Sequence, residues 1–314
     1  MTDTTPGHVE HRADLPAPKM VALGGGFHAF IQLDGSWGLN NAGVFVGDDG
    51  VVVIDTAFTA DRGRLLRDAV RELSDLPVRT VLNTHHHGDH VYGNYLFPGA
   101  TVVSSERCRE AVLADEFEVT NWFPGVEWGD LRVSPPTLTF EDSISIWCGD
   151  VRAIARHVGP AHTSNDVFVW VPERRLLYAA DLVFHGGTPF VVMGSIQGLI
   201  EALGELAALE PETVVPGHGE LTGPESIQDQ LAYLRFVQEV AAEGFRAGKE
   251  PLELARATDL GPFARLTDPE RIVGNLHRAY SELRGEPLGQ PLDYHGIVAE
   301  MVEYNGGRPL RCLA

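Results

Sequence analysis

Positively charged residues are scarce in this chain, and lysine is nearly absent. Lys19 and Lys249 are the two lysines among 24 basic residues, against 44 acidic residues, so the formal net charge is −20. Nucleic-acid binding needs clustered lysine and arginine side chains that contact phosphates. The composition therefore argues against nucleic acid as a partner.

Cysteine is also rare, and long apolar runs are missing. The three cysteines, Cys108, Cys148 and Cys312, are odd in number and far apart, so they predict neither a disulfide framework nor a CxxC metal pair. No apolar run approaches the roughly 18 residues that a membrane span needs. Residues 1–19 are polar and lack the apolar stretch of a signal peptide. We therefore expect a cytoplasmic protein without a membrane partner.

What the chain does contain is a regular pattern of strands and helices. Hydrophobic residues make up 44% of its 314 residues, which is ample for a sizeable core. Turn residues between β-rich runs predict hairpins at 39–56 and 166–181, and apolar residues at helical spacing predict helices at 61–75 and 197–209. Strands followed by a helix, twice over, favour an α/β fold in which two sheets lie between helices, a four-layer αββα sandwich.

Three parts are expected along the chain. Residues 1–22 form a flexible lead-in, residues 23–223 form the sandwich, and residues 224–314 form a helical extension packed on it. Helical patterns in the extension cover residues 224–247, 251–258, 268–284 and 292–304. Within the sandwich, residues 137–147 and 151–158 alternate like a pair of strands.

The most informative stretch is THHHGDH, which holds four histidines and an aspartate within seven residues. It follows directly on the predicted strand at 78–84. His85 and His87 are two residues apart, so in extended chain they point the same way and can bind one ion, whereas His86 faces away. Gly88 permits a turn, after which Asp89 and His90 can bind a second ion beside the first.

Three later residues lie at further strand-to-loop junctions: His162, Asp181 and His218. Imidazole and carboxylate ligands suit Zn²⁺, although iron and manganese accept the same set. A single histidine is more often a core or surface residue, and a single aspartate after a strand is usually a turn-former. Five histidines and two aspartates in this order instead predict a dinuclear metal site.

The pattern HxHxDH, followed by His162, Asp181 and His218, resembles the metal-binding motif of the metallo-β-lactamase superfamily. The resemblance implies two Zn²⁺ with these ligands: His85, His87 and His162 for one ion, Asp89, His90 and His218 for the other, and Asp181 bridging both. It also implies that the ions supply a hydroxide, with Asp89 among the catalytic residues. Asp55 would be the superfamily's buried aspartate that supports the metal loop, or else a simple strand-terminal cap.

The residue type at position 181 differs between branches of the superfamily. Antibiotic-hydrolysing members commonly carry cysteine or serine there, whereas aspartate is typical of glyoxalase II-like thioesterases. Segments such as NNAGVFVGDDG, VLNTHHHGDHVYGN, VGPAHTSNDVFVW and the ending VEYNGGRPLRCLA are most similar to one group. These are the metallo-β-lactamase-fold cyclases that close the second or third ring in bacterial type II aromatic polyketide pathways, the actinorhodin cyclase among them.

This resemblance implies a zinc-dependent polyketide cyclase. Such enzymes close a ring by intramolecular aldol condensation on a polyketide bound to an acyl carrier protein, and some also hydrolyse the thioester. Two alternatives remain open. The chain could be a glyoxalase II-like thioesterase, a lactonase or another dinuclear zinc hydrolase, phosphodiesterases included. It could also be a binding protein with a degenerate metal site, although its complete ligand set argues against that.

An aromatic polyketide needs a broad apolar cavity with a few polar anchors. The candidate lining residues near the metal loops are Trp37, Asn41, Phe58, Tyr92, Trp122, Phe123, Trp128, Phe184, His185, Phe190 and Met193. Each of them is equally compatible with a purely structural place in the core. Helices of the extension that cap the cavity with apolar residues would favour a polyketide substrate, whereas a shallow basic groove would favour phosphodiesters.

Carrier proteins are generally acidic, and so is this chain, so docking requires a local basic patch. The candidates in the extension are Arg235, Arg246, Arg256, Arg265, Arg271 and Arg278. The alternative for each of them is a place on a mixed, solvated helix face.

Overall fold

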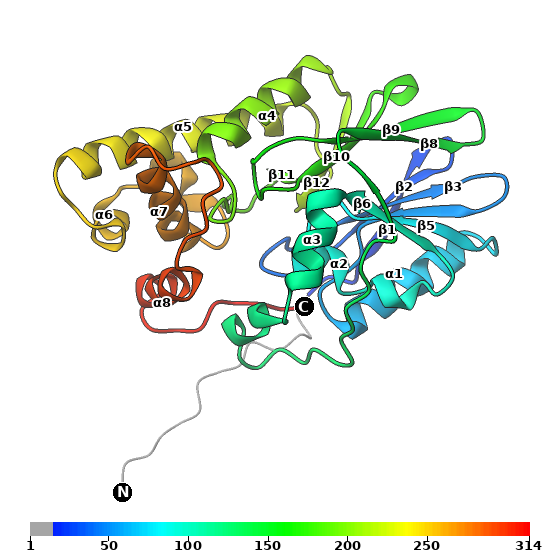
Figure 1. Cartoon of the computed structure of the whole chain (residues 1–314), viewed down its shortest axis with the longest axis horizontal. Coiled ribbons are helices and arrows are strands. Elements are labelled where there is room, and N and C mark those ends of the chain that lie inside the picture. The colour runs from blue at the N-terminus through cyan, green and yellow to red at the C-terminus, as the bar shows by residue number, and fades with distance from the viewer. Residues whose placement is uncertain (1–14) are drawn as a thin grey trace, which may run out of the picture.

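The structure is a computed structural model that describes residues 15–314, apart from the side chain of Cys148. Two β-sheets lie at the centre, and helices lie outside them on either side (Figure 1). This is the αββα sandwich that the sequence predicts. The remaining helices, which follow the last strand, gather at one end of the molecule (Figure 1).

The first sheet has seven strands in sequential order from β1 to β7. Their bounds are Lys19–Gly24 (β1), Phe27–Ile31 (β2), Ala42–Val46 (β3), Val51–Ile54 (β4), Val78–Leu82 (β5), Thr101–Ser105 (β6) and Leu138–Phe140 (β7). Strands β1 to β4 pair antiparallel, whereas β4 to β7 pair parallel. Because the carboxyl ends of parallel strands meet at one edge, the loops after β4 and β5 come together there.

The second sheet has five strands in the order β12-β11-β10-β9-β8. Their bounds are Ser143–Cys148 (β8), Val151–His157 (β9), Val167–Val171 (β10), Leu176–Phe184 (β11) and Thr213–His218 (β12). Neighbouring strands are antiparallel except for β11 and β12, which are parallel. The carboxyl ends of β11 and β12 therefore face the same edge of the sandwich.

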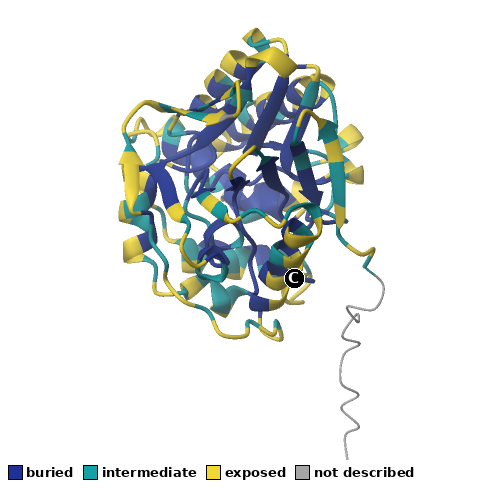
Figure 2. Cartoon of the chain, turned by 90° about the vertical axis from the view of Figure 1, so that its right-hand side faces the viewer, coloured by how far each residue is buried: buried dark blue, intermediate teal, exposed yellow. Residues whose placement is uncertain are grey.

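Apolar side chains fill the space between the sheets. Phe27 and Phe45 of the first sheet contact edge to face at 4.5 Å, and the Phe45 ring lies 5.5 Å from Tyr178 of the second. Figure 2 shows the central strands as buried, whereas strands at the sides of the sandwich and the outer helix faces are partly exposed. The alternation of inward and outward residues along each strand produces this core.

Helices cover the outer faces of both sheets. On the first sheet, Leu66 and Val70 of α1 (Ala60–Leu73) belong to the same buried cluster as Val44 and Val53. On the second sheet, α4 (Ile196–Ala208) and α5 (Glu225–Arg246) bury their apolar stripes. Two shorter helices are α2 (Gly88–Val91), which contains the end of the histidine motif, and α3 (Glu106–Ala114), which follows β6.

The extension beyond β12 is helical, as predicted. It consists of α5, α6 (Pro251–Ala257), a short 3-10 turn η5 (Gly261–Arg265), α7 (Arg271–Leu283) and α8 (Tyr294–Tyr304). Helix α7 is its centre, because α5, α6 and α8 all pack against it. Across residues 15–314, none of the helices has both the length and the apolar character that a membrane crossing requires.

Two predictions about local structure are wrong. The predicted strand at 137–147 is two strands, because the polar pair Glu141 and Asp142 interrupts it and β7 and β8 enter different sheets. The predicted lead-in over residues 1–22 overlaps β1, which begins at Lys19 and pairs with β2. Residues 1–14 lie outside the described part of the chain.

Candidate metal centre

The edge where both sheets end carries the residues that the sequence singles out. His85 to His87 follow β5, and the turn of α2 positions Asp89 and His90. Contrary to expectation, Asp181 does not end its strand, because β11 continues to Phe184. The ladder between β11 and β12 shifts register on both sides of Ala180, whose φ is +47°. This irregularity accompanies the turn of the Asp181 side chain into the site.

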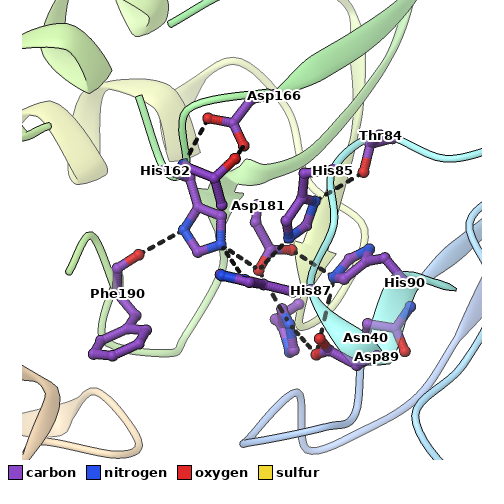
Figure 3. A network of polar contacts seen from close by, with 12 residues as sticks. Asn40, Thr84, His85, His87, Asp89, His90, His162, Asp166, Asp181 and Phe190 are labelled. Carbon is purple, nitrogen blue, oxygen red and sulfur yellow. Dashed lines mark hydrogen bonds and ion pairs between the residues drawn. The ribbon is translucent and has the colours of Figure 1, made fainter. Parts of the chain in front are cut away.

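The seven predicted ligands form two adjoining groups, and the atoms within each group lie within 4.8 Å of one another. One group contains His85, His87, His162 and Asp181, and the other contains Asp89, His90 and His218. In Figure 3 the labelled side chains of both groups lie around the carboxylate of Asp181. His86 belongs to neither group and instead contacts Asn165, with Nδ1 3.0 Å from the amide nitrogen. The structure therefore brings together the residues that the motif predicts and leaves His86 aside.

Asp181 lies between the two groups. Its Oδ2 is 3.3 Å from Nε2 of His162 and 3.5 Å from Nε2 of His218. Its Oδ1 is 3.1 Å from Nε2 of His90. One carboxylate thus contacts imidazoles of both groups, which is the position that a bridging ligand requires.

The outer nitrogen of most imidazoles is already occupied by a protein partner. The Nδ1 contacts are His85 to Thr84 Oγ1 (3.0 Å), His90 to Asp55 Oδ2 (2.8 Å), His162 to the Phe190 carbonyl (2.5 Å) and His218 to the Gly35 carbonyl (3.1 Å). Such contacts fix the ring orientation and the tautomer, and they leave Nε2 for a metal ion. His87 is reversed, since its Nδ1 lies 2.9 Å from Nε2 of His162 and its Nε2 lies 3.2 Å from Sδ of Met193.

The donor atoms themselves provide a test of whether a metal fits. Nε2 of His85 is buried and makes no hydrogen bond to any residue in the described part of the chain, and the buried Nε2 of His90 and Oδ1 of Asp181 face each other at 3.1 Å. Buried polar atoms without a partner are costly in free energy. Since these atoms converge, cations between the groups would satisfy them together. The imidazole and carboxylate donors fit two such ions.

The electrostatics of the cluster agree with this fit. Burial lowers the pKa of His162 to about 4 and the pKa of His85 well below its ordinary value, so both rings are neutral, as metal ligation requires. Burial also opposes protonation of His218, but the carboxylates of Asp181 and Asp89 raise its pKa to about 9. A cation that neutralised these carboxylates would replace the proton of His218.

Asp55 supports the cluster from outside. Its Oδ1 accepts a hydrogen bond from the backbone N–H of Thr84 at 2.7 Å, and its Oδ2 accepts one from the Thr84 hydroxyl at 2.7 Å. The same Oδ2 contacts His90, as described above. The residue is therefore more than a cap of β4, and it corresponds to the supporting aspartate that the resemblance implies.

A sequence profile described as "Metallo-beta-lactamase superfamily" matches residues 35–218, which contain all seven residues of the cluster. The chain belongs to this superfamily. The overall fold of the chain is also that of a metallo-β-lactamase. The structure of a metallo-beta-lactamase from Pontibacter korlensis, with 18% sequence identity, superposes with a TM-score of 0.59 over 69% of this chain and 99% of that one.

Characterised relatives have several activities. A hydroxyacylglutathione hydrolase from Methylococcus capsulatus is 30% identical over 202 residues, which cover 60% of this chain and 70% of the relative. A linear primary-alkylsulfatase from Pseudomonas sp. is 22% identical over 317 residues, covering 83% of this chain and 60% of the relative. This chain thus spans less than two thirds of the alkylsulfatase. Both of these relatives are named for hydrolytic reactions.

A cavity of about 710 Å³ opens onto the metal cluster of this metallo-β-lactamase fold. The predicted substrate residues that line it are Trp37, Phe58, Tyr92, Trp122, Phe123, Phe184, Phe190 and Met193. Trp128 lies behind this wall, with its ring 4.7 Å from that of Phe58. The wall is largely aromatic, and it adjoins His87, Asp89 and Asp181.

Two predicted polar anchors do not line the cavity. The amide of Asn41 donates to the carbonyls of Pro216 and Gly219 at 2.9 and 2.8 Å, so it fastens the strand that carries His218. His185 turns to the surface, where its Nδ1 lies 3.0 Å from the carbonyl of Glu220. Both residues have structural roles, because their side chains contact backbone carbonyl groups near His218.

The helical extension also lines the cavity, although it lies beyond the part that matches the superfamily profile. It contributes Arg271, Pro291, Leu292, Asp293, Tyr294 and His295. Near the 3-10 turn η3 (Glu118–Trp122), the wall also carries Asp115, Glu116 and Glu118, and Oε2 of Glu118 lies 3.7 Å from Nε2 of His295 in the extension. No local sequence pattern identifies the cavity residues of the extension. More than a hundred residues of sequence separate them from the metal motif, and only the fold brings the two together.

Proposed function

We propose that this chain is a dinuclear zinc enzyme that hydrolyses the thioester of a bulky, largely aromatic acyl group. One observation carries the proposal, namely the 710 Å³ cavity that joins the His/Asp cluster to an aromatic wall. Apolar pockets with a few polar groups favour ligands of the same character. The similarity to hydroxyacylglutathione hydrolases supports thioester hydrolysis as the reaction.

The acidic residues around the cavity outnumber Arg271, the arginine that lines it, and they argue against an anionic substrate such as glutathione or a phosphodiester. Asp115, Glu116, Glu118 and Asp293 all contribute to its lining. These carboxylates would repel the carboxylates of glutathione and the phosphate of a diester. A neutral aromatic acyl group meets no such repulsion.

The metal ions, Asp89 and the aromatic wall would have different roles in the reaction. When bound, the metal ions would polarise the thioester carbonyl and make water acidic enough to supply a nucleophile near neutral pH. Asp89 reaches the cavity, with its carboxylate 14% exposed and Oδ2 3.3 Å from Nε2 of His218. It is therefore placed to accept a proton from the attacking water. The aromatic wall holds the acyl chain against the cluster and keeps bulk water out.

A specific observation favours a second candidate, which is ring closure of a polyketide. Leu292, Pro291 and Tyr294 of the extension cap the cavity, and apolar capping is the feature expected for a folded polyketide. In an intramolecular aldol condensation, a Cα proton is removed, a carbon–carbon bond forms to a ketone and water is then lost. The same carbonyl-polarising chemistry serves this reaction.

An acyl carrier protein as the partner belongs to this second candidate. Of the arginines predicted to dock it, Arg271 and Arg278 are 1% and 0% exposed, so the structure rules out docking through them. Arg256 is exposed and lies 3.0 Å from Glu303, which neutralises part of its charge. The exposed candidates that remain are Arg235, Arg246 and Arg265. Reversing these three to glutamate should weaken carrier-protein binding and leave turnover of a free thioester intact.

Hydrolysis is tested with the 2-naphthoyl thioester of N-acetylcysteamine and full-length protein. Zinc-loaded protein should release the thiol, whereas chelator-treated protein, verified by elemental analysis, should not. The variant Asp89→Ala removes both a metal ligand and the proton acceptor, so it should reduce kcat by about a hundredfold or more. Equal rates with and without metal would refute the proposed function.

Ring closure is tested with a first-ring-cyclised polyketide attached to its carrier protein. Loss of water together with a new ultraviolet chromophore indicates cyclisation. Gain of water with release of the free acid indicates hydrolysis alone, and would remove the second candidate.

A further inference from the structure

His86 is the histidine of the motif that belongs to neither metal group, and it lines the cavity. It is half-buried, whereas its neighbour His85, a predicted metal ligand, is buried. Asp115, which also lines the cavity, interacts electrostatically with the ring of His86. The ring therefore lies beside the space that a substrate would occupy.

Asn165 fixes the orientation of this ring. Its Oδ1 accepts a hydrogen bond from the backbone N–H of His86 at 3.1 Å, which determines how the amide group is turned. The amide nitrogen then lies 3.0 Å from Nδ1 of His86, closer than Oδ1 at 3.4 Å. Asn165 is 0% exposed, and its backbone carbonyl accepts a hydrogen bond from the Ser105 hydroxyl at 3.0 Å. A ring held in this way can bind a ligand with little loss of conformational entropy.

The contact with Asn165 also determines which ring nitrogen of His86 carries the proton. Nδ1 accepts from the amide N–H, so the proton of the neutral ring is on Nε2. The protonated ring carries a hydrogen on Nε2 as well, so this donor is present in both charge states. Nε2 makes no hydrogen bond to residues 15–314, yet it is not among their buried atoms without a partner, so it keeps accessible surface. An accessible N–H on a residue of the cavity wall is available to a bound molecule.

A hydroxyl group adjoins the same amide. Ser164 is exposed and lines the cavity, and its Oγ lies 3.4 Å from the amide nitrogen of Asn165. His86 and Ser164 thus form a polar subsite beside the aromatic wall, and one buried amide contacts both. Neither residue belongs to a metal group. An oxygen bound at this subsite is therefore a different atom from the thioester carbonyl oxygen that the ions would polarise.

We propose that His86 determines substrate specificity by donating a hydrogen bond from Nε2 to a carbonyl or phenolic oxygen on the aromatic part of the substrate. This inference rests on the proposed function, and it specifies the substrate class further. The enzyme would select aromatic acyl groups that carry an oxygen at this position over hydrocarbons of the same shape.

The test compares two probes of nearly equal shape, 2-acetylnaphthalene and 2-isopropenylnaphthalene, in which a carbonyl oxygen replaces a CH2 group. Equilibrium dialysis with zinc-loaded full-length protein gives a dissociation constant for each probe. The ratio of the two constants is compared between wild type and variant, because the different hydration of the probes cancels in this comparison. His86→Phe keeps a ring but removes the N–H, so the preference for the ketone should fall about fivefold, as loss of one hydrogen bond does.

The variant His86→Gln provides a conservative replacement. Its side-chain amide can place an N–H near the position of Nε2, so it should retain more of the ketone preference than His86→Phe. Elemental analysis should find the zinc content of the wild type in both variants, because His86 is not a ligand. Loss of zinc in either variant, or an equal loss of preference in both, would overturn the inference.

His157 provides the matched control. It is also half-buried, and its Nδ1 lies 2.9 Å from the backbone carbonyl of Asp166. In the part of the chain that the structure describes, it does not line the cavity. His157→Phe should therefore keep the wild-type ratio of dissociation constants. An unchanged ratio in His86→Phe, or an equal fall in His157→Phe, would contradict the role of His86.

The outcomes also separate this inference from the proposed function. If the ratio falls in His86→Phe but the wild type does not hydrolyse the naphthoyl thioester, the role of His86 in binding is supported and thioester hydrolysis is refuted. If the wild type hydrolyses the thioester but the ratio is the same in His86→Phe, the reaction is supported and the role of His86 is refuted.

Discussion

Oδ2 of Asp55 lies 2.8 Å from Nδ1 of His90, and this contact ties the end of β4 to the metal cluster. Asp55 has a φ of +62°, a conformation that costs free energy in any residue except glycine. Burial also raises the pKa of its carboxyl group. Both costs are tolerated where the carboxylate orients His90 and, through the Thr84 hydroxyl, His85.

Replacing Asp55 with asparagine should weaken metal binding. An amide N–H in place of Oδ2 would face the N–H of His90, which removes the hydrogen bond that orients the ring. We expect metal affinity to fall about 10- to 100-fold, as is typical when an outer partner of a metal ligand is lost. Competition against a chelating dye measures this change. The control is Asp75→Asn, on the exposed surface after α1. Equal metal affinity in the two variants would mean that Asp55 only caps the end of β4.

Gly217 gives the cluster the space that Asp181 needs. A Cβ atom at this position would lie 1.9 Å from Oδ1 of Asp181. Gly217→Ala should therefore displace the carboxylate that lies between the two groups and reduce the number of ions bound per chain. Elemental analysis after gel filtration measures the ratio.

The control for Gly217→Ala is Gly204→Ala. A Cβ at Gly204, within α4, meets no atom within 4 Å among the described residues. This substitution should leave the metal content unchanged and stabilise the helix by about 0.5–1 kcal/mol. Full metal content in Gly217→Ala would contradict the bridging position of Asp181.

The metal cluster and the fold class can be predicted from the sequence because they depend on local signals. Histidines at fixed spacing after an apolar strand identify the cluster, and the turn residues at 47–50 identify the β3–β4 hairpin. Alternation also identifies β8 and β9. In each of these cases the residues that interact are close together in the sequence.

Features that depend on distant contacts are not predicted. One local detail is also wrong, because the sequence favours Asp61 as the N-cap of the helix at 61–75, whereas the hydroxyl of Thr59 accepts from the N–H of Arg62 at 3.3 Å and caps α1. Arg271 and Arg278 have the charge of surface residues, yet both are buried because carbonyls of the 188–192 segment accept their N–H groups. No local pattern reveals such acceptors.

Asp268 should give folding stability a specific dependence on pH. Burial raises the pKa of its carboxyl to about 6 from 3.8, although Arg271 opposes the shift. The folded protein thus binds this proton more tightly than the unfolded chain. The contribution to stability is complete below the unfolded pKa and is lost as the pH rises through 6. A shift of this size corresponds to about 3 kcal/mol.

The variant Asp268→Asn isolates this effect because it removes the titrating group. The free energy of unfolding of wild type minus that of the variant should fall by about this amount between about pH 4 and pH 7. Urea denaturation at a series of pH values measures the difference, and the titration of other groups cancels in it. Parallel pH profiles of the two proteins would show that Asp268 does not titrate in this range.

Leu292 tests whether the extension shapes the substrate site. It lines the cavity from the segment before α8, and the aromatic residues near η3 line it as well. Leu292→Trp adds volume to this wall, so it should lower kcat/KM for the naphthoyl thioester at least tenfold, since an excluded aromatic ring forfeits most of its apolar contact. The acetyl thioester occupies little of the cavity, and its kcat/KM should change less than twofold. Leu292→Ala, which enlarges the site, serves as the size control. Equal losses for both thioesters in Leu292→Trp would mean that the substitution disturbs the metal cluster, and that the extension does not contact the acyl group.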